Sequence, residues 1–103
     1  MNAKKPTPED LEASLRTSYG TVLGSDLAAH LKRDGVLFID RSLDLITCGI
    51  AIAQDEAALV STWLGRGLVR RPTAEERERW LETPDRQWLA TVVQPYVLIQ
   101  ELD

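Results

Sequence analysis

Five arginines lie within fourteen positions in the second half of the chain and are its strongest candidates for binding chemistry. They are Arg66, Arg70, Arg71, Arg77 and Arg79. A guanidinium group can hold a carboxylate or a phosphate through two parallel hydrogen bonds, so Arg66, Arg70 and Arg71 are candidate anion contacts. Four glutamates alternate with these arginines at the spacing of ion pairs on a helix surface. That pattern favours a solvated face whose charges neutralise one another.

The only histidine, His30, is the one candidate for a general base. A catalytic role requires a nucleophile and an orienting acid beside the imidazole, and one sequence cannot place them. A metal site requires at least two further good ligands, but the chain has one cysteine and no second histidine. We therefore predict a structural role for His30, with no catalytic residue, no metal site and no cofactor. A small-molecule site near His30 is the alternative.

The lone cysteine, Cys48, excludes an intrachain disulfide and suits a reducing compartment. Its neighbours Ile46 and Ile50 are apolar, which favours a buried and unreactive thiol. The nearby run 40–44 begins like a calcium-binding loop. The match fails because Leu45 stands where that loop needs glycine and Ala51 where it needs a bidentate acid.

Aromatic side chains are the residues best suited to anchor a protein partner. Trp63 falls on the apolar stripe of a predicted helix and is expected in the core. The candidate interface residues are Trp80, Trp88 and Tyr96. Trp80 lies on a mostly polar segment, and Trp88 and Tyr96 lie on either side of Pro95. A plain core position is the competing interpretation of these residues and has slightly more support.

The 103 residues, 44% of them apolar and 27% charged, suit one globular domain. We predict a flexible N-terminal arm over residues 1–6 and a single α+β domain over residues 7–103. The net charge of −4 disfavours binding to nucleic acid or to an anionic membrane. The start of the chain lacks the apolar segment of a signal peptide, and no apolar run is long enough to cross a bilayer, so we expect a cytoplasmic protein.

Four helices and a hairpin are predicted from the hydrophobic pattern. The helices begin near Thr7, Ser25, Asp55 and Thr73, each at a residue suited to capping a helix N-terminus. An apolar run at 36–39 and an alternating run at 44–53 together predict a β-hairpin over residues 36–53. Residues 68–70 are a candidate short strand.

The C-terminal segment is the most apolar and β-prone part of the chain. Residues 84–93 also have helical spacing, but β-branched residues favour a strand from Trp88 to about residue 101. A primed hairpin turn needs positive φ, which Pro95 cannot adopt, so we predict one long strand bent or bulged at this proline. The predicted fold class is α+β, with a mostly antiparallel sheet (the hairpin at 36–53 and the strand at 88–101) packed with about four helices.

A strand that is apolar on both faces must be covered on both. Because the fourth helix is short and polar, a second copy of the chain is the simplest cover for the second face, and we predict a homodimer. The alternative is that the four helices divide between the two faces and complete the monomer.

Three segments of the chain resemble a small, uncharacterised bacterial family of domains of unknown function (DUF2288-like). They are Ser42–Leu45 before the alternating run, Trp63 before a Gly-bounded turn, and the run Val92–Gln100. In that family the residue after this proline is usually tryptophan, and Tyr96 keeps an aromatic ring there. The resemblance implies a bacterial, cytosolic protein and implies no activity.

We therefore predict a non-catalytic interaction or accessory module that self-associates or binds a protein partner. The alternative is a small-molecule or anion-binding protein, which includes an enzyme, with its site near the arginine cluster at 66–79 or near His30.

Overall fold

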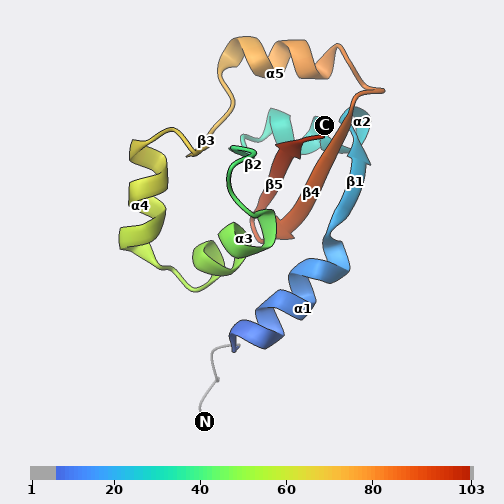
Figure 1. Ribbon diagram of the computed structural model, residues 1–103. Helices are drawn as coiled ribbons and strands as arrows, with labels where there is room; N and C mark the ends of the chain where they lie inside the picture. Colours follow the sequence, from blue (N-terminus) through green and yellow to red (C-terminus); the bar gives the residue numbers. More distant parts are fainter. Residues whose placement is uncertain (1–6, 103) are drawn as a thin grey trace.

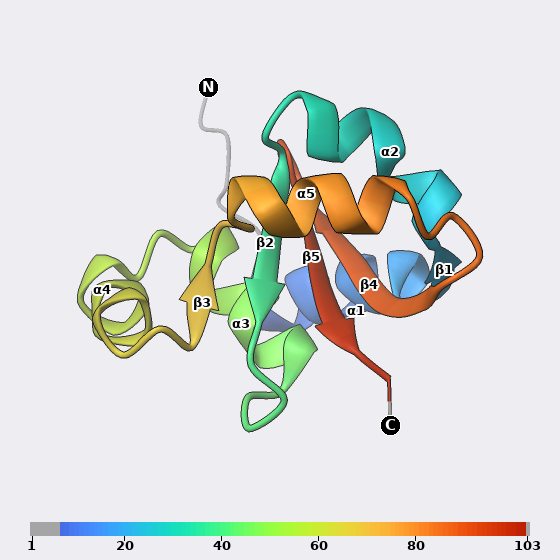
Figure 2. The same cartoon turned by 90° about the horizontal axis from the view of Figure 1, so that it is seen from above.

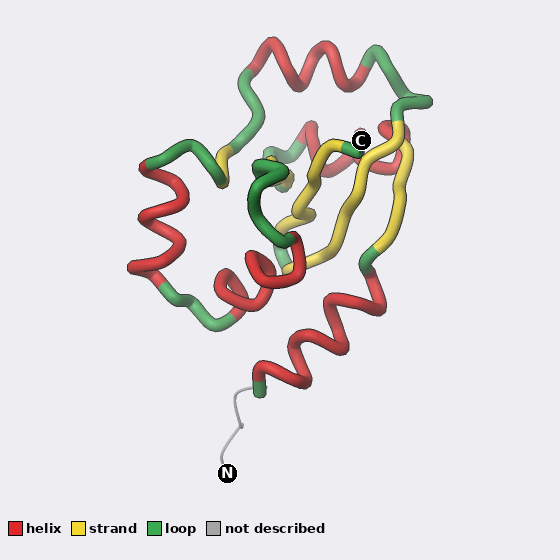
Figure 3. The backbone as a smooth tube through the Cα atoms, viewed as in Figure 1, coloured by secondary structure: helices red, strands yellow, loops and turns green. Residues whose placement is uncertain are grey.

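The computed structural model describes residues 7–102, which form five helices and five strands (Figures 1 and 3). The predicted arm at residues 1–6 lies outside this described part. In chain order the elements are α1 (Pro8–Ser18), β1 (Gly20–Leu23), α2 (Gly24–Lys32), β2 (Val36–Ile39), α3 (Leu45–Ala53), α4 (Ala57–Gly65), β3 (Val69–Arg70), α5 (Ala74–Leu81), β4 (Gln87–Val93) and β5 (Tyr96–Glu101).

The strands form one mixed sheet in the order β1-β4-β5-β2-β3. β2 and β5 run parallel, and the other three neighbouring pairs are antiparallel. The α+β class is therefore confirmed. The sheet is mixed rather than purely antiparallel, and the described residues form five helices where the sequence predicted about four.

The helices divide between the two faces of the sheet (Figures 1 and 2). α2 and α5 pack on the face that carries Trp88, Ala90 and Ile99, which we call the Trp88 face. α1, α3 and α4 contribute to the core on the opposite face, which carries Val93 and Leu98 and which we call the Leu98 face. This arrangement is the alternative considered above, so the need to cover a whole second face no longer argues for a dimer.

The predicted second strand of the hairpin at 36–53 is wrong, because residues 45–53 form helix α3. The Asp44 carboxylate accepts hydrogen bonds from the Thr47 backbone N–H (2.9 Å) and hydroxyl (2.8 Å) and so caps this helix. Alternation was misleading here because α3 is apolar on nearly every side. A short, continuously apolar run suits a buried helix as well as a strand, and tertiary contacts decide between them.

The prediction of a single bent strand at the C-terminus is also wrong. The chain reverses at Gln94 and Pro95, and β4 and β5 pair as a hairpin from Val93 opposite Tyr96 to Trp88 opposite Glu101. The Gln94–Pro95 peptide bond is cis, and a turn of this type accepts proline without positive φ. The turn places Trp88 and Leu98 on opposite faces, whereas a continuous strand would place them together. Residues 87–93 are strand, as favoured from the sequence.

The predicted helix starts are correct at both threonine caps. The Thr7 hydroxyl accepts from the Asp10 backbone N–H (3.1 Å), and the Thr73 hydroxyl accepts from the Glu76 backbone N–H (3.1 Å). The strand β1 was missed. Its four residues lie between two predicted helices and were assigned to no element, and only pairing with β4 makes them a strand.

Candidate functional site

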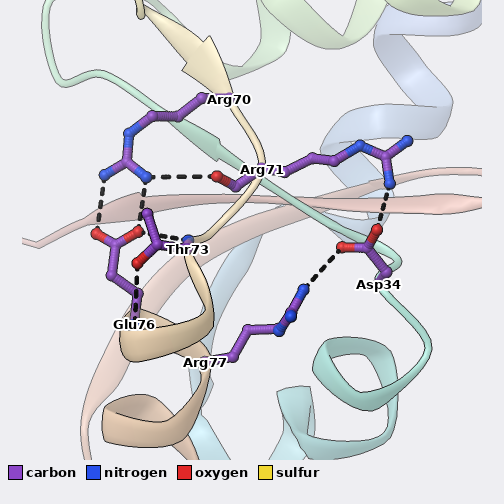
Figure 4. A network of polar contacts seen from close by, with 6 residues as sticks. All are labelled: Asp34, Arg70, Arg71, Thr73, Glu76 and Arg77. Atoms are coloured by element: carbon purple, nitrogen blue, oxygen red, sulfur yellow. Dashed lines mark hydrogen bonds and ion pairs between the residues drawn. The ribbon is translucent and has the colours of Figure 1, made fainter.

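Arg70, one of the predicted anion contacts, is held by an acid of the chain itself (Figure 4). Its Nη1 and Nη2 donate to Oε1 and Oε2 of Glu76 at 2.7 and 2.9 Å. The guanidinium also lies over the Phe38 ring, 4.7 Å from the ring centre. A bidentate pair of this kind satisfies both charges, so Arg70 ties β3 to α5 rather than offering donors to a ligand.

This pair makes part of the stability pH-dependent. The hydrogen bonds from Arg70 and from the Thr73 backbone lower the pKa of Glu76 to about 2. Because the folded pKa lies below the unfolded value of 4.5, the stabilisation is present above about pH 4.5 and is lost as the pH falls toward 2. Between pH 5.5 and 3 we expect the wild type to lose about 1 kcal/mol more unfolding free energy than Glu76→Gln. Urea unfolding at both pH values measures this difference.

The matched control is Glu75→Gln, which changes an exposed glutamate of the same helix turn. It should keep the pH dependence of the wild type. Equal losses in the wild type and Glu76→Gln would mean that the Arg70–Glu76 pair does not stabilise the fold.

Two other arginines, Arg71 and Arg77, share one carboxylate, that of Asp34. Arg71 donates to Oδ2 of Asp34, and Arg77 donates to Oδ1 of the same carboxylate at 3.4 Å (Figure 4). Asp34 follows α2 and has positive φ (60°), a conformation that aspartate tolerates better than most residues. Two guanidinium groups therefore meet one carboxylate, and their charges are only partly neutralised.

His30 lies on α2 beside this network, and its Nδ1 is 2.6 Å from Nη2 of Arg33. Arg33 and Arg71 line a pocket of about 300 Å³, whose other lining residues are Asp34, Gly35, Pro95 and Tyr96. Of the predicted anion contacts, only Arg71 lines this pocket. Arg66 caps the end of α4 and lies outside the network, while the sequence analysis did not single out Arg33 or Asp34.

The structure places two of the three candidate interface residues in the interior. Trp88 is fully buried and Trp80 is 3% exposed. Their ring centres are 4.7 Å apart, and Phe38 stacks on Trp80 at 5.6 Å. Trp80 and Trp88 are therefore core residues. Tyr96 is half-buried and packs against the core of the Leu98 face.

Cys48 is buried in α3, as the apolar flanks suggested, although in a helix and not a strand. Burial raises the pKa of its thiol to about 11, so the reactive thiolate is disfavoured at neutral pH. Within residues 7–102, no group of three or more histidine, cysteine, aspartate or glutamate side chains is placed to hold a metal ion. None of the described helices is long and apolar enough to cross a membrane.

A strip of the Leu98 face beside β1 carries exposed apolar side chains. Leu23 lies opposite Gln87, and Thr21 lies opposite the half-buried Leu89. Tyr19 precedes β1 in extended conformation (φ −76°, ψ 130°), so the alternation of a strand puts its side chain on the same side as Thr21. On the other flank, Leu102 and Leu89 line one groove. We call Tyr19, Thr21, Leu23, Gln87, Leu89 and Leu102 the β1 strip.

Three large apolar side chains of the β1 strip are well exposed: Tyr19 and Leu23 at 40% and Leu102 at 38%. Farther along the same face α1 covers the sheet, where the Thr91 hydroxyl donates to the Leu15 carbonyl (2.7 Å). In Figure 1, α1 and α3 lie toward the β4–β5 turn, at the other end of the strands. One sequence signal for this strip was missed: residues 17–25 carry no charge, in a chain that is 27% charged.

Comparison with known proteins supports the fold and assigns no activity. The model of the family described as "Protein of unknown function (DUF2288)" matches residues 10–101. Among solved structures, the solution structure of PA1075 from Pseudomonas aeruginosa is similar, with 28% identity and a TM-score of 0.77. The similarity covers 100% of this chain and 94% of that one. No curated protein matches this chain. The match over residues 10–101, together with the resemblance noted from the sequence, shows that the chain belongs to the DUF2288 family.

Proposed function

We propose that this protein is a non-catalytic interaction module that self-associates through the β1 strip. The observation that carries the proposal is the group of three exposed apolar side chains, Tyr19, Leu23 and Leu102, on a part of the sheet face that the described helices leave open. Apolar surface gathered on one face favours association, because contact removes it from water.

A second copy of the chain is the occupant that the charges favour. All six side chains of the β1 strip are uncharged. Arg41 and Glu101 line the groove beside Leu102, and Glu101 is paired with Arg86 at 3.1 Å, so two identical strips can meet with few charges between them. Elsewhere two copies repel, since each has a net charge of −4. Thr21 and Gln87 are neutral and both donate and accept hydrogen bonds, which allows each to pair with its own copy across a two-fold axis.

The contact is face to face rather than edge to edge. The outward N–H of Leu23 already donates to the Asp26 carboxylate (2.9 Å), and α2 begins directly after β1. This leaves little free backbone for an added strand. Three strands span only about 10 Å between the outer two, a smaller area than a standard interface, so we expect a weak dimer that forms at tens to hundreds of micromolar.

Sedimentation equilibrium from about 10 to 500 µM tests this function. The wild type should shift from the monomer mass of 11.5 kDa toward twice that mass as the concentration rises. Leu23→Lys and Leu102→Lys each place a charge in the strip and should stay monomeric over the same range. The control Leu64→Lys changes a side chain of α4 that is 52% exposed and should associate like the wild type.

A single 11.5 kDa species for the wild type at every concentration would overturn the proposal. Association that survives both strip variants but fails in Leu64→Lys would move the interface to α4. Circular dichroism of each variant checks that the fold is kept.

A further inference from the structure

We propose that the pocket between the end of α2 and the β4–β5 turn binds the phosphate group of a small molecule. This pocket, lined by Arg33, Asp34, Gly35, Arg71, Pro95 and Tyr96, is called the Asp34 pocket below. The inference is independent of self-association through the β1 strip, because the two sites share no residue.

Positive charge is concentrated at the Asp34 pocket, in contrast to the acidic chain as a whole. A second hollow shares Asp34 with it and adds Lys32, Arg77 and Glu78 to its lining. The two hollows together bring four basic side chains against two acidic ones. A dianion in the Asp34 pocket would meet two arginines and one carboxylate there, and the neighbouring hollow adds one further net positive charge.

The shared carboxylate of Asp34 keeps two of these arginines in place. Arg71 and Arg77 approach its two oxygens from different segments, the β3–α5 connection and α5 itself (Figure 4). Each guanidinium carries five N–H donors, and within residues 7–102 each donates one hydrogen bond, to Asp34, so further donors remain. This differs from Arg70, whose two terminal nitrogens both bond Glu76.

The other walls suit a small organic phosphate. The volume of about 300 Å³ is at the lower end of small-molecule pockets. Gly35 is buried and has no side chain, and Tyr96 and Pro95 supply an apolar wall from the turn. A guanidinium binds phosphate in its planar fork, and Arg33 and Arg71 are the two that line the pocket.

The test is a titration of the isotope-labelled full chain with inorganic phosphate at constant ionic strength and pH 7.5, followed by amide NMR shifts. We expect saturable shifts centred on the amides of residues 33–35, 71 and 96, with millimolar affinity. Arg71→Gln and Arg33→Gln should each weaken binding about tenfold, a loss typical of one charge-assisted contact. Arg66→Gln, which removes an arginine outside the pocket, is the matched control and should bind like the wild type.

Asp34→Asn gives a result of opposite sign. Asparagine tolerates the positive φ of this position and keeps one oxygen that accepts from a guanidinium, while the change removes a negative charge from the pocket. Phosphate should therefore bind several-fold more tightly to Asp34→Asn than to the wild type. Shifts that never saturate, or equal affinities in Arg71→Gln and Arg66→Gln, would overturn the proposal. Stronger binding of succinate than of phosphate would replace the ligand class by dicarboxylates.

Discussion

Replacing Trp88 by alanine is expected to lower the free energy of unfolding by about 3–5 kcal/mol. Trp88 is fully buried on the Trp88 face. Its ring meets Trp80 edge-on at 4.7 Å and Phe38 at 6.2 Å, and the Arg86 guanidinium lies 3.9 Å from the ring centre. Truncation removes all of these contacts and leaves a cavity. Urea unfolding followed by circular dichroism measures the loss.

A second variant tests whether the loss at this position follows the amount of packing removed. The indole Nε1 of Trp88 is buried and has no hydrogen-bond partner in the described part of the chain. Trp88→Phe therefore sacrifices packing but no hydrogen bond and should cost less than half as much as Trp88→Ala. The exposed control Leu64→Ala should change stability by less than about 0.5 kcal/mol. A Trp88→Ala protein as stable as wild type, but altered in association, would restore Trp88 to an interface.

Replacing Gly24 by alanine is expected to destabilise the protein by about 1–3 kcal/mol, although alanine is the better helix former. Gly24 is the first residue of α2, and its backbone N–H donates to the Arg86 carbonyl at 2.7 Å. A Cβ at this position would lie 2.6 Å from the Thr83 carbonyl oxygen and 3.4 Å from the Pro84 Cα. These are backbone atoms, so the clash is relieved only by moving α2 away from the α5–β4 connection.

The matched control is Gly65→Ala at the end of α4. A Cβ there meets no atom within 4 Å, so the substitution should stabilise the protein by about 0.5–1 kcal/mol through helix propensity alone. Thermal and urea unfolding of both variants should thus show shifts of opposite sign. If Gly24→Ala also gains stability, the close approach of α2 to the α5–β4 connection is wrong.

Local signals in the sequence were sufficient for the α+β class and for the two helix starts at Thr7 and Thr73, whereas α2 and α4 are capped at Leu23 and Glu56 rather than at the predicted Ser25 and Asp55. Thr7 and Thr73 cap helices through their own side chains, and a cap depends only on residues within one turn. The pairing of Arg70 with Glu76 is likewise local, because six positions separate them. Arg70 was nevertheless predicted as a free anion contact, because six positions exceed the i,i+3 and i,i+4 spacings of helix-surface pairs.

The hydrophobic pattern failed where a segment is apolar on all sides. Residues 45–53 were predicted as a strand and form a helix. They are buried by α1, α4 and the sheet and have no polar face, so the hydrophobic pattern does not distinguish the helical period from the strand period. The reversal at Gln94 and Pro95 was missed for a different reason. The turn is accommodated by a cis peptide bond, which the residue types permit but do not require.

The candidate sites were decided by tertiary structure. The sequence by itself determined that arginines cluster at 66–79 and that the chain lacks a second histidine or cysteine. It could not determine that Asp34, thirty-seven positions before Arg71, would accept hydrogen bonds from two of those arginines. The β1 strip likewise depends on which strands are neighbours, since Leu23 lies opposite Gln87 only through the β1–β4 pairing. Contacts between distant segments follow from how the helices and strands pack, and packing depends on the whole chain rather than on any single stretch of it.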